Sequence, residues 1–191
     1  MKKFFNYVTI ALVAFNFVAC GDDDPAPVNE EEVITTVKLS VQEAGAPSAT
    51  EYTWTEDSQD DITLNANSSY NIKIQFLDES NPDDVEDITA EVIEEKDEHY
   101  VFYQTTAGNL TFTNASDDTI DSDSVGINIS TDWTTGAASS GIIKAFLIHE
   151  PTTKDGTERD DFGGETDIEV DFNVSIVVPV SYTHLTLPTI A

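Results

Sequence analysis

The sequence predicts a mainly β protein, an antiparallel sandwich with one short helix. Short runs in which apolar and polar residues alternate recur along the chain, and this period of two is typical of strands buried on one face. Turn-forming clusters of small and polar residues separate the runs. Only one segment has the spacing of a helix, and it is short.

The first half of the chain gives three strands and the helix. Alternation begins at Val37 in the first run, and the run 69–77 is the cleanest because Tyr70, Ile72, Ile74 and Phe76 share one face. The strands predicted here cover 33–42, 52–55 and 69–77. Residues 81–95 place Val85, Ile88 and Val92 at three- and four-residue spacings, which predicts a short amphipathic helix.

Five more strands are predicted in the second half, the last of which alternates through five apolar positions. Turns at 107–109 and 136–141 separate neighbours among them. The Cys and Trp spacing of true immunoglobulin domains is absent from the sequence, so the pattern supports an immunoglobulin-like architecture only. These strands cover 100–103, 110–113, 125–129, 142–149 and 167–176.

The amino terminus has the form of a bacterial lipoprotein signal. Lys2 and Lys3 precede an apolar run too short to span a bilayer, and Val18-Ala19-Cys20 closes it. We therefore expect a signal peptide over 1–19 and lipidation of Cys20, the only cysteine of the chain. Acyl chains on Cys20 would anchor the protein to a membrane without crossing it. The alternative is a plain secretory peptide.

Residues 20–32 are acidic and contain two prolines, and we interpret them as a solvated tether before a β domain at 33–178. Its start, Gly21-Asp22-Asp23-Asp24, resembles the acidic segment behind the lipidated cysteine of surface-exported Bacteroidota lipoproteins. That resemblance implies the outer face of the outer membrane. The string 180–189 resembles a translated sequencing adapter, so 179–191, with His184, is left out of the fold.

The chain is strongly acidic, with eight Lys or Arg, 37 Asp or Glu and a formal net charge of −29. Nucleic acids and anionic lipids need a basic surface, so this charge argues against both as partners. No G-x-S-x-G, H-E-x-x-H or glycine-rich phosphate motif is present. We therefore expect a protein that is not an enzyme.

His99 and His149 each have an acidic neighbour, Glu98 and Glu150, and lie at the ends of predicted strands. Two imidazoles with one or two carboxylates suit zinc or a similar divalent cation. The four residues are therefore candidate metal ligands if the strands bring them together. In the alternative, His149 caps a strand and His99 lies exposed after the helix.

Acidic clusters, two short Asp-Ser/Thr strings and three aromatic residues are further candidate sites, each of which could also be a purely structural feature. Two clusters rich in carboxylates, at 117–123 and 155–161, suggest calcium but lack EF-hand spacing. Asp118-Thr119-Ile120 and Asp123-Ser124-Val125 resemble the O-glycosylation acceptors of Bacteroidota, which would modify Thr119 and Ser124. Tyr52, Trp54 and Trp133 form either a ligand platform or part of the core.

Four strings resemble a family of small flavobacterial-type lipoproteins, often labelled a type 1 periplasmic binding fold. They are Glu30–Thr36, Thr135–Gly141, His149–Pro151 and Gly163–Val170. This chain lacks the long alternating helices that the label implies. The resemblance implies genes beside TonB-dependent receptors and hence a binding or accessory role in nutrient or divalent-metal uptake. The alternative is a structural or adhesive surface domain without a small ligand.

Overall fold

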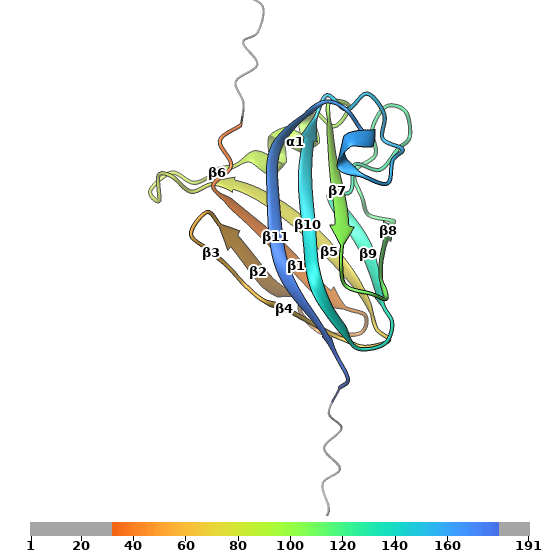
Figure 1. The fold of residues 1–191 in the computed structure, drawn as a ribbon. Coiled ribbons are helices and arrows are strands. Elements are labelled where there is room, and N and C mark those ends of the chain that lie inside the picture. The colour runs from red at the N-terminus through yellow and green to blue at the C-terminus, as the bar shows by residue number, and fades with distance from the viewer. Residues whose placement is uncertain (1–31, 180–191) are drawn as a thin grey trace, which may run out of the picture. The chain divides into compact units, whose positions relative to one another are not determined.

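Two β-sheets pack face to face in the computed structural model, which describes residues 32–179 (Figure 1). The sandwich and its one short α-helix confirm the predicted fold class. The signal peptide, Cys20, the tether up to residue 31 and the tail from Val180 lie outside the described residues. In the described part, no helix is long and apolar enough to cross a membrane.

The larger sheet has the strand order β3-β2-β1-β5-β9-β8, and β6 pairs with β5 beside this path. The smaller sheet has the order β4-β11-β10-β7. The strands of the larger sheet are β1 (Thr36–Glu43), β2 (Thr50–Thr55), β3 (Ser58–Gln59), β5 (Ser69–Asp78), β6 (Glu86–Asp87), β8 (Leu110–Asn114) and β9 (Ser130–Thr135). Those of the smaller sheet are β4 (Ile62–Asn65), β7 (His99–Thr105), β10 (Ser139–His149) and β11 (Glu165–Val177).

Alternation along the strands builds the core between the sheets. In β1 and β5, Leu39 pairs with Ile74 and Val37 with Phe76, and all four side chains are buried. From the smaller sheet, every second residue of β11 from Val170 to Ile176 is buried against them. Removing these apolar faces from water is the main stabilising contribution to the sandwich.

One strand pair departs from the predicted antiparallel arrangement. The short strand β4, which the sequence analysis did not predict, pairs in parallel with β11, aligning Ile62 with Val174 and Leu64 with Ile176. Its four residues are too few for periodicity to distinguish a strand from a loop. Every other strand pair of the described residues is antiparallel.

The helix α1 (Ile88–Glu94) is shorter than the predicted 81–95. The Asp87 side chain accepts a hydrogen bond from the backbone N–H of Thr89, which fixes the helix start. Val85 therefore lies before the helix and is 49% exposed. The prediction that Val85 lies on the buried face of the helix was wrong. Ile88 and Val92 are buried, as their spacing predicts.

The predicted strand 125–129 is also wrong, because this segment is a loop that precedes β9. The buried carboxylate of Asp118 accepts the backbone N–H groups of Asn128 and Ser130. Asn128 adopts a positive φ of 66°, which interrupts an extended strand. Asp118 thus takes the N–H of Asn128 that a regular strand would offer to a neighbour, although the carbonyl oxygens of Ile127 and Ile129 still accept from Val101 and Ile74.

Candidate functional site

His99 and His149 lie side by side at one end of the smaller sheet. His99 is the first residue of β7 and His149 the last residue of β10. The two strands lie side by side (Figure 1), and their register pairs His99 directly with His149. Their ring centroids are 4.7 Å apart and the rings stack. His99 is fully buried and the His149 side chain is 7% exposed. The alternative of an exposed His99 is therefore wrong.

Two carboxylates that the sequence analysis did not single out, Glu32 and Asp167, face these rings. Glu32 Oε1 lies 3.1 Å from His99 Nε2. Asp167 Oδ2 lies 3.9 Å from the same nitrogen, and Asp167 Oδ1 lies 3.9 Å from His149 Nδ1. Ligand atoms of all four residues lie within 4.8 Å of one another. We call Glu32, His99, His149 and Asp167 the inner group.

A β-bulge in β11 positions Asp167. Leu147 pairs with Ile168 but Ile148 pairs with Thr166, so Asp167 is an extra residue in β11. Farther along β11, residues of odd number such as Glu169 face away from the core. Regular alternation would have put Asp167 on that outer face, whereas a bulge re-aims a side chain.

The hydrogen bonding of His99 fixes which nitrogen faces the carboxylates. Its Nδ1 lies 3.3 Å from the backbone carbonyl oxygen of Glu95, just after α1. Because a carbonyl only accepts, Nδ1 donates its hydrogen to Glu95, and Nε2 is the nitrogen that faces the carboxylates of Glu32 and Asp167. Histidines that bind metal ions commonly hold their other nitrogen in this way.

The inner group concentrates negative charge in a buried place. The side chains of Glu32 and Asp167 are 6% and 5% exposed. Glu32 Oε2 and Asp167 Oδ2 have no hydrogen-bond partner among the described residues. Burial, and then the Glu32 carboxylate, raise the pKa of Asp167 to about 6, while the two imidazoles oppose the rise. Buried carboxylates need a compensating positive charge, which protons on the imidazoles or a bound cation would supply.

A cavity of about 120 Å³ adjoins the inner group. Glu32, His149 and Asp167 line it together with Glu165 and Thr166. Since one water needs only about 10–15 Å³ of such space, the cavity has room for an ion with a water ligand.

The structure separates Glu98 and Glu150, the two acidic candidates from the sequence, from the inner group. Both are exposed. Glu98 Oε2 lies 3.9 Å from Nε2 of His149, and Glu98, His149 and Glu150 form a second group with ligand atoms within 4.8 Å. We call these three residues the outer group. The backbone N–H of Glu150 donates to the carbonyl oxygen of Glu98 at 2.6 Å, which holds the two residues together.

Gly164 allows the chain to close behind this site. It has a positive φ of 63°, and a Cβ there would collide with the backbone carbonyl oxygen of His149. A side chain at Gly164 would therefore push the start of β11 away from the end of β10.

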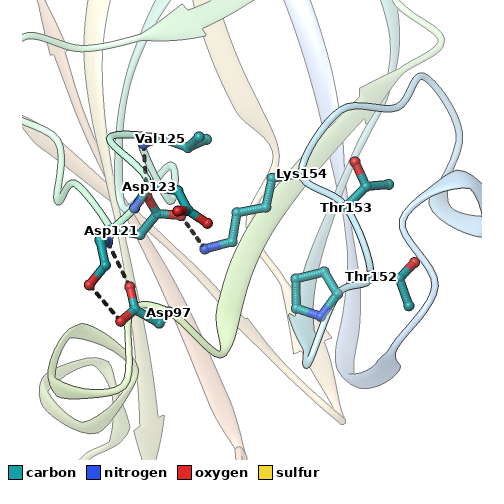
Figure 2. Close-up of a pocket in the computed structure, with 9 residues that line it drawn as sticks. Asp97, Asp121, Asp123, Val125, Thr152, Thr153 and Lys154 are labelled. Atoms are coloured by element: carbon teal, nitrogen blue, oxygen red, sulfur yellow. Dashed lines mark hydrogen bonds and ion pairs between the residues drawn. The ribbon is translucent and has the colours of Figure 1, made fainter.

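The aspartates of the first carboxylate cluster stabilise the loop that they belong to. Asp118 is buried and accepts two backbone N–H groups. Asp121 accepts a hydrogen bond from Lys154 Nζ at 2.7 Å (Figure 2), and Asp117 pairs with Lys73 at 2.9 Å. Their oxygens are thus directed to different partners within the protein, and the calcium interpretation receives no support from this geometry.

The second carboxylate cluster includes a helix cap. The Asp161 carboxylate accepts the backbone N–H groups of Thr157 and Glu158 at the 3-10 turn Arg159–Asp161, which it caps.

The remaining candidates have the following places. Ser124 is exposed and Thr119 is half-buried in the loop before β9. Trp133 is fully buried, and Tyr52 and Trp54 are partly buried and pack against the core. Packing in the core therefore accounts for these aromatic residues.

Comparison with protein-family models, with curated proteins and with solved structures finds no match for this chain.

Proposed function

We propose that this protein is a lipid-anchored surface lipoprotein whose sandwich binds one divalent transition-metal ion, with zinc as the first candidate. In this role it serves as an accessory for metal or nutrient uptake beside an outer-membrane receptor. The observation that carries the proposal is the convergence of two imidazoles and two buried carboxylates in the inner group.

The donor set favours a metal ion over a network of protons. Two nitrogens and the carboxylate oxygens of Glu32 and Asp167 suit zinc and its neighbours in the first transition series. A divalent cation would balance the charge of two carboxylates beside neutral imidazoles. The cation would also be a partner for Glu32 Oε2 and Asp167 Oδ2, the two oxygens that lack hydrogen bonds.

Calorimetry tests the metal site directly. The mature protein, freed of metal by a chelator, is titrated with zinc chloride at neutral pH, and we expect one ion to bind per chain. His99→Gln and His149→Gln should each weaken binding by more than about a hundredfold, because losing a ligand costs more than losing an outer-shell partner.

Glu165→Gln is the matched control, since Glu165 lines the same cavity without belonging to either group. It should keep wild-type binding. Circular dichroism shows whether each variant is folded. Absence of heat with the wild-type protein would refute the metal proposal and leave the structural or adhesive alternative.

The membrane anchor has its own test. An inhibitor of lipoprotein signal peptidase should leave the precursor uncut, and Cys20→Ser should abolish incorporation of labelled fatty acid. Processing that persists under the inhibitor would contradict lipidation at Cys20.

A further inference from the structure

We propose that the outer group is a transient metal site through which the ion reaches and leaves the inner group. This inference rests on the proposed metal function and adds to it the route of exchange. In this scheme Glu98 and Glu150 bind the ion only on its way, and His149 belongs to both groups.

The shared histidine is the first argument. His149 Nδ1 is directed toward Asp167, at 3.9 Å, and Nε2 toward Glu98, also at 3.9 Å. The His149 side chain is only 7% exposed. Neither of its ring nitrogens has a hydrogen bond to a described residue. An imidazole without such bonds between two sets of carboxylates can bind an ion on either side.

The difference in burial between the two groups is the second argument. His99 and Asp167 of the inner group are closed off from solvent, at 0% and 5% side-chain exposure. The Glu98 side chain is 58% exposed, so it meets a hydrated ion first. An ion that exchanges part of its water for Glu98, Glu150 and His149 then needs only a short displacement to the inner carboxylates.

The acidic surroundings support capture at this place. A net charge of −29 raises the local concentration of cations, and exposed carboxylates next to a buried site increase the association rate more than the affinity. Glu98 and Glu150 are held at adjacent ends of β7 and β10 by their backbone hydrogen bond. Both carboxylates thus start from backbone positions next to His149, and in the structure each has an oxygen within 4.8 Å of a nitrogen of its ring.

Rates separate this role from an orienting one. A group that lies only on the path changes the association and dissociation rate constants by the same factor and leaves Kd unchanged. A carboxylate that merely orients His149 would change Kd itself. Stopped-flow mixing of the mature protein with zinc, and of the zinc-loaded protein with excess chelator, measures both rate constants.

We expect Glu98→Gln/Glu150→Gln to lower both rate constants by about tenfold, the lower end of the effect that charged groups lining an approach path have on association rates, with an unchanged calorimetric Kd. Glu165→Gln removes one charge beside the cavity but no member of the outer group, and it should keep the wild-type rates.

Three results would overturn the inference while the metal site stands. They are unchanged rates in the double variant, a weaker Kd with an unchanged association rate, and an equal slowing by Glu165→Gln. If the wild-type protein takes up no zinc, the proposed function itself is refuted, and the exchange route falls with it.

Discussion

Two buried tyrosines show how much a single hydroxyl contributes to this core. Tyr103 lies among Phe112 and Trp133, and its hydroxyl has no hydrogen-bond partner in the part of the chain that the structure describes. Burial raises the pKa of Tyr103. The hydroxyl of Tyr70, by contrast, accepts the backbone N–H of Asn65 at 2.6 Å. The same functional group is thus a cost at one position and a stabilising contact at the other.

Tyr103→Phe should leave the free energy of unfolding unchanged or raise it by up to about 1 kcal/mol, because it removes a buried polar atom that lacks a partner. Tyr70→Phe, the matched variant, should lower it by about 1–2 kcal/mol, since the Asn65 N–H loses its acceptor. Urea unfolding measures both. A larger loss for Tyr103→Phe than for Tyr70→Phe would contradict this explanation.

At the scale of elements, the segment between β10 and β11 is fixed at two points. Phe162 packs on the outer face of the smaller sheet, 4.6 Å between ring centroids from Phe102. Lys154 reaches across to donate to Asp121 (Figure 2). It also donates to the backbone carbonyl oxygen of Lys96. The segment thereby ties the loop before β9 and the end of α1 to the sheet that carries His149.

Lys154→Met should lower the free energy of unfolding by about 2 kcal/mol at neutral pH, since a hydrogen bond to a charged group is lost. Burial would raise the pKa of Asp121, but Lys154 and the backbone N–H groups of Val125 and Asp123 outweigh it and lower the pKa. A lowered carboxyl pKa adds stability above the ordinary value of about 4, and this contribution disappears as the pH falls below it.

The difference between wild type and Lys154→Met should therefore shrink in acid. Urea unfolding at neutral and acidic pH measures it. A difference that stays constant with pH would show that Lys154 acts through packing of its alkyl chain rather than through Asp121.

For the whole molecule, the dominant electrostatic fact is the excess of negative charge. Lys38, Lys73, Lys144 and Lys154 each form an ion pair with a carboxylate, yet these pairs are few beside 37 acidic residues. Self-repulsion among the remaining carboxylates opposes the folded state. A bound divalent cation would offset part of it.

The metal-free protein should therefore gain stability as sodium chloride rises from low to physiological ionic strength (about 0.15 M), because salt screens like charges. Urea unfolding at the two salt concentrations measures the gain. Asp83→Asn/Asp84→Asn, in an exposed turn, should raise stability at low salt and reduce the gain. A loss of stability with salt would mean that the ion pairs outweigh the repulsion.

The alternation of side chains was enough to predict the sandwich, because a period of two encodes which face of a strand is buried. Together with the turn signals between the runs, it correctly identified β1, β2, β5, β7, β8, β10 and β11. It failed at 125–129, where Asp118 takes the backbone N–H of Asn128, which periodicity cannot assign, and it missed β9. The scarcity of histidine drew attention to His99 and His149, and their acidic neighbours supplied the outer group.

Only the tertiary structure brought Glu32 and Asp167 to the histidines. Glu32 is 67 residues from His99 in sequence, so no local spacing relates them. Asp167 lies in a run whose alternation directs it outward, and the bulge opposite Leu147 and Ile148 reverses that direction. Sequence periodicity shows which face of a strand a side chain lies on only while the strand register is regular. The register itself, and contacts between residues far apart in sequence, arise from the pairing of whole strands.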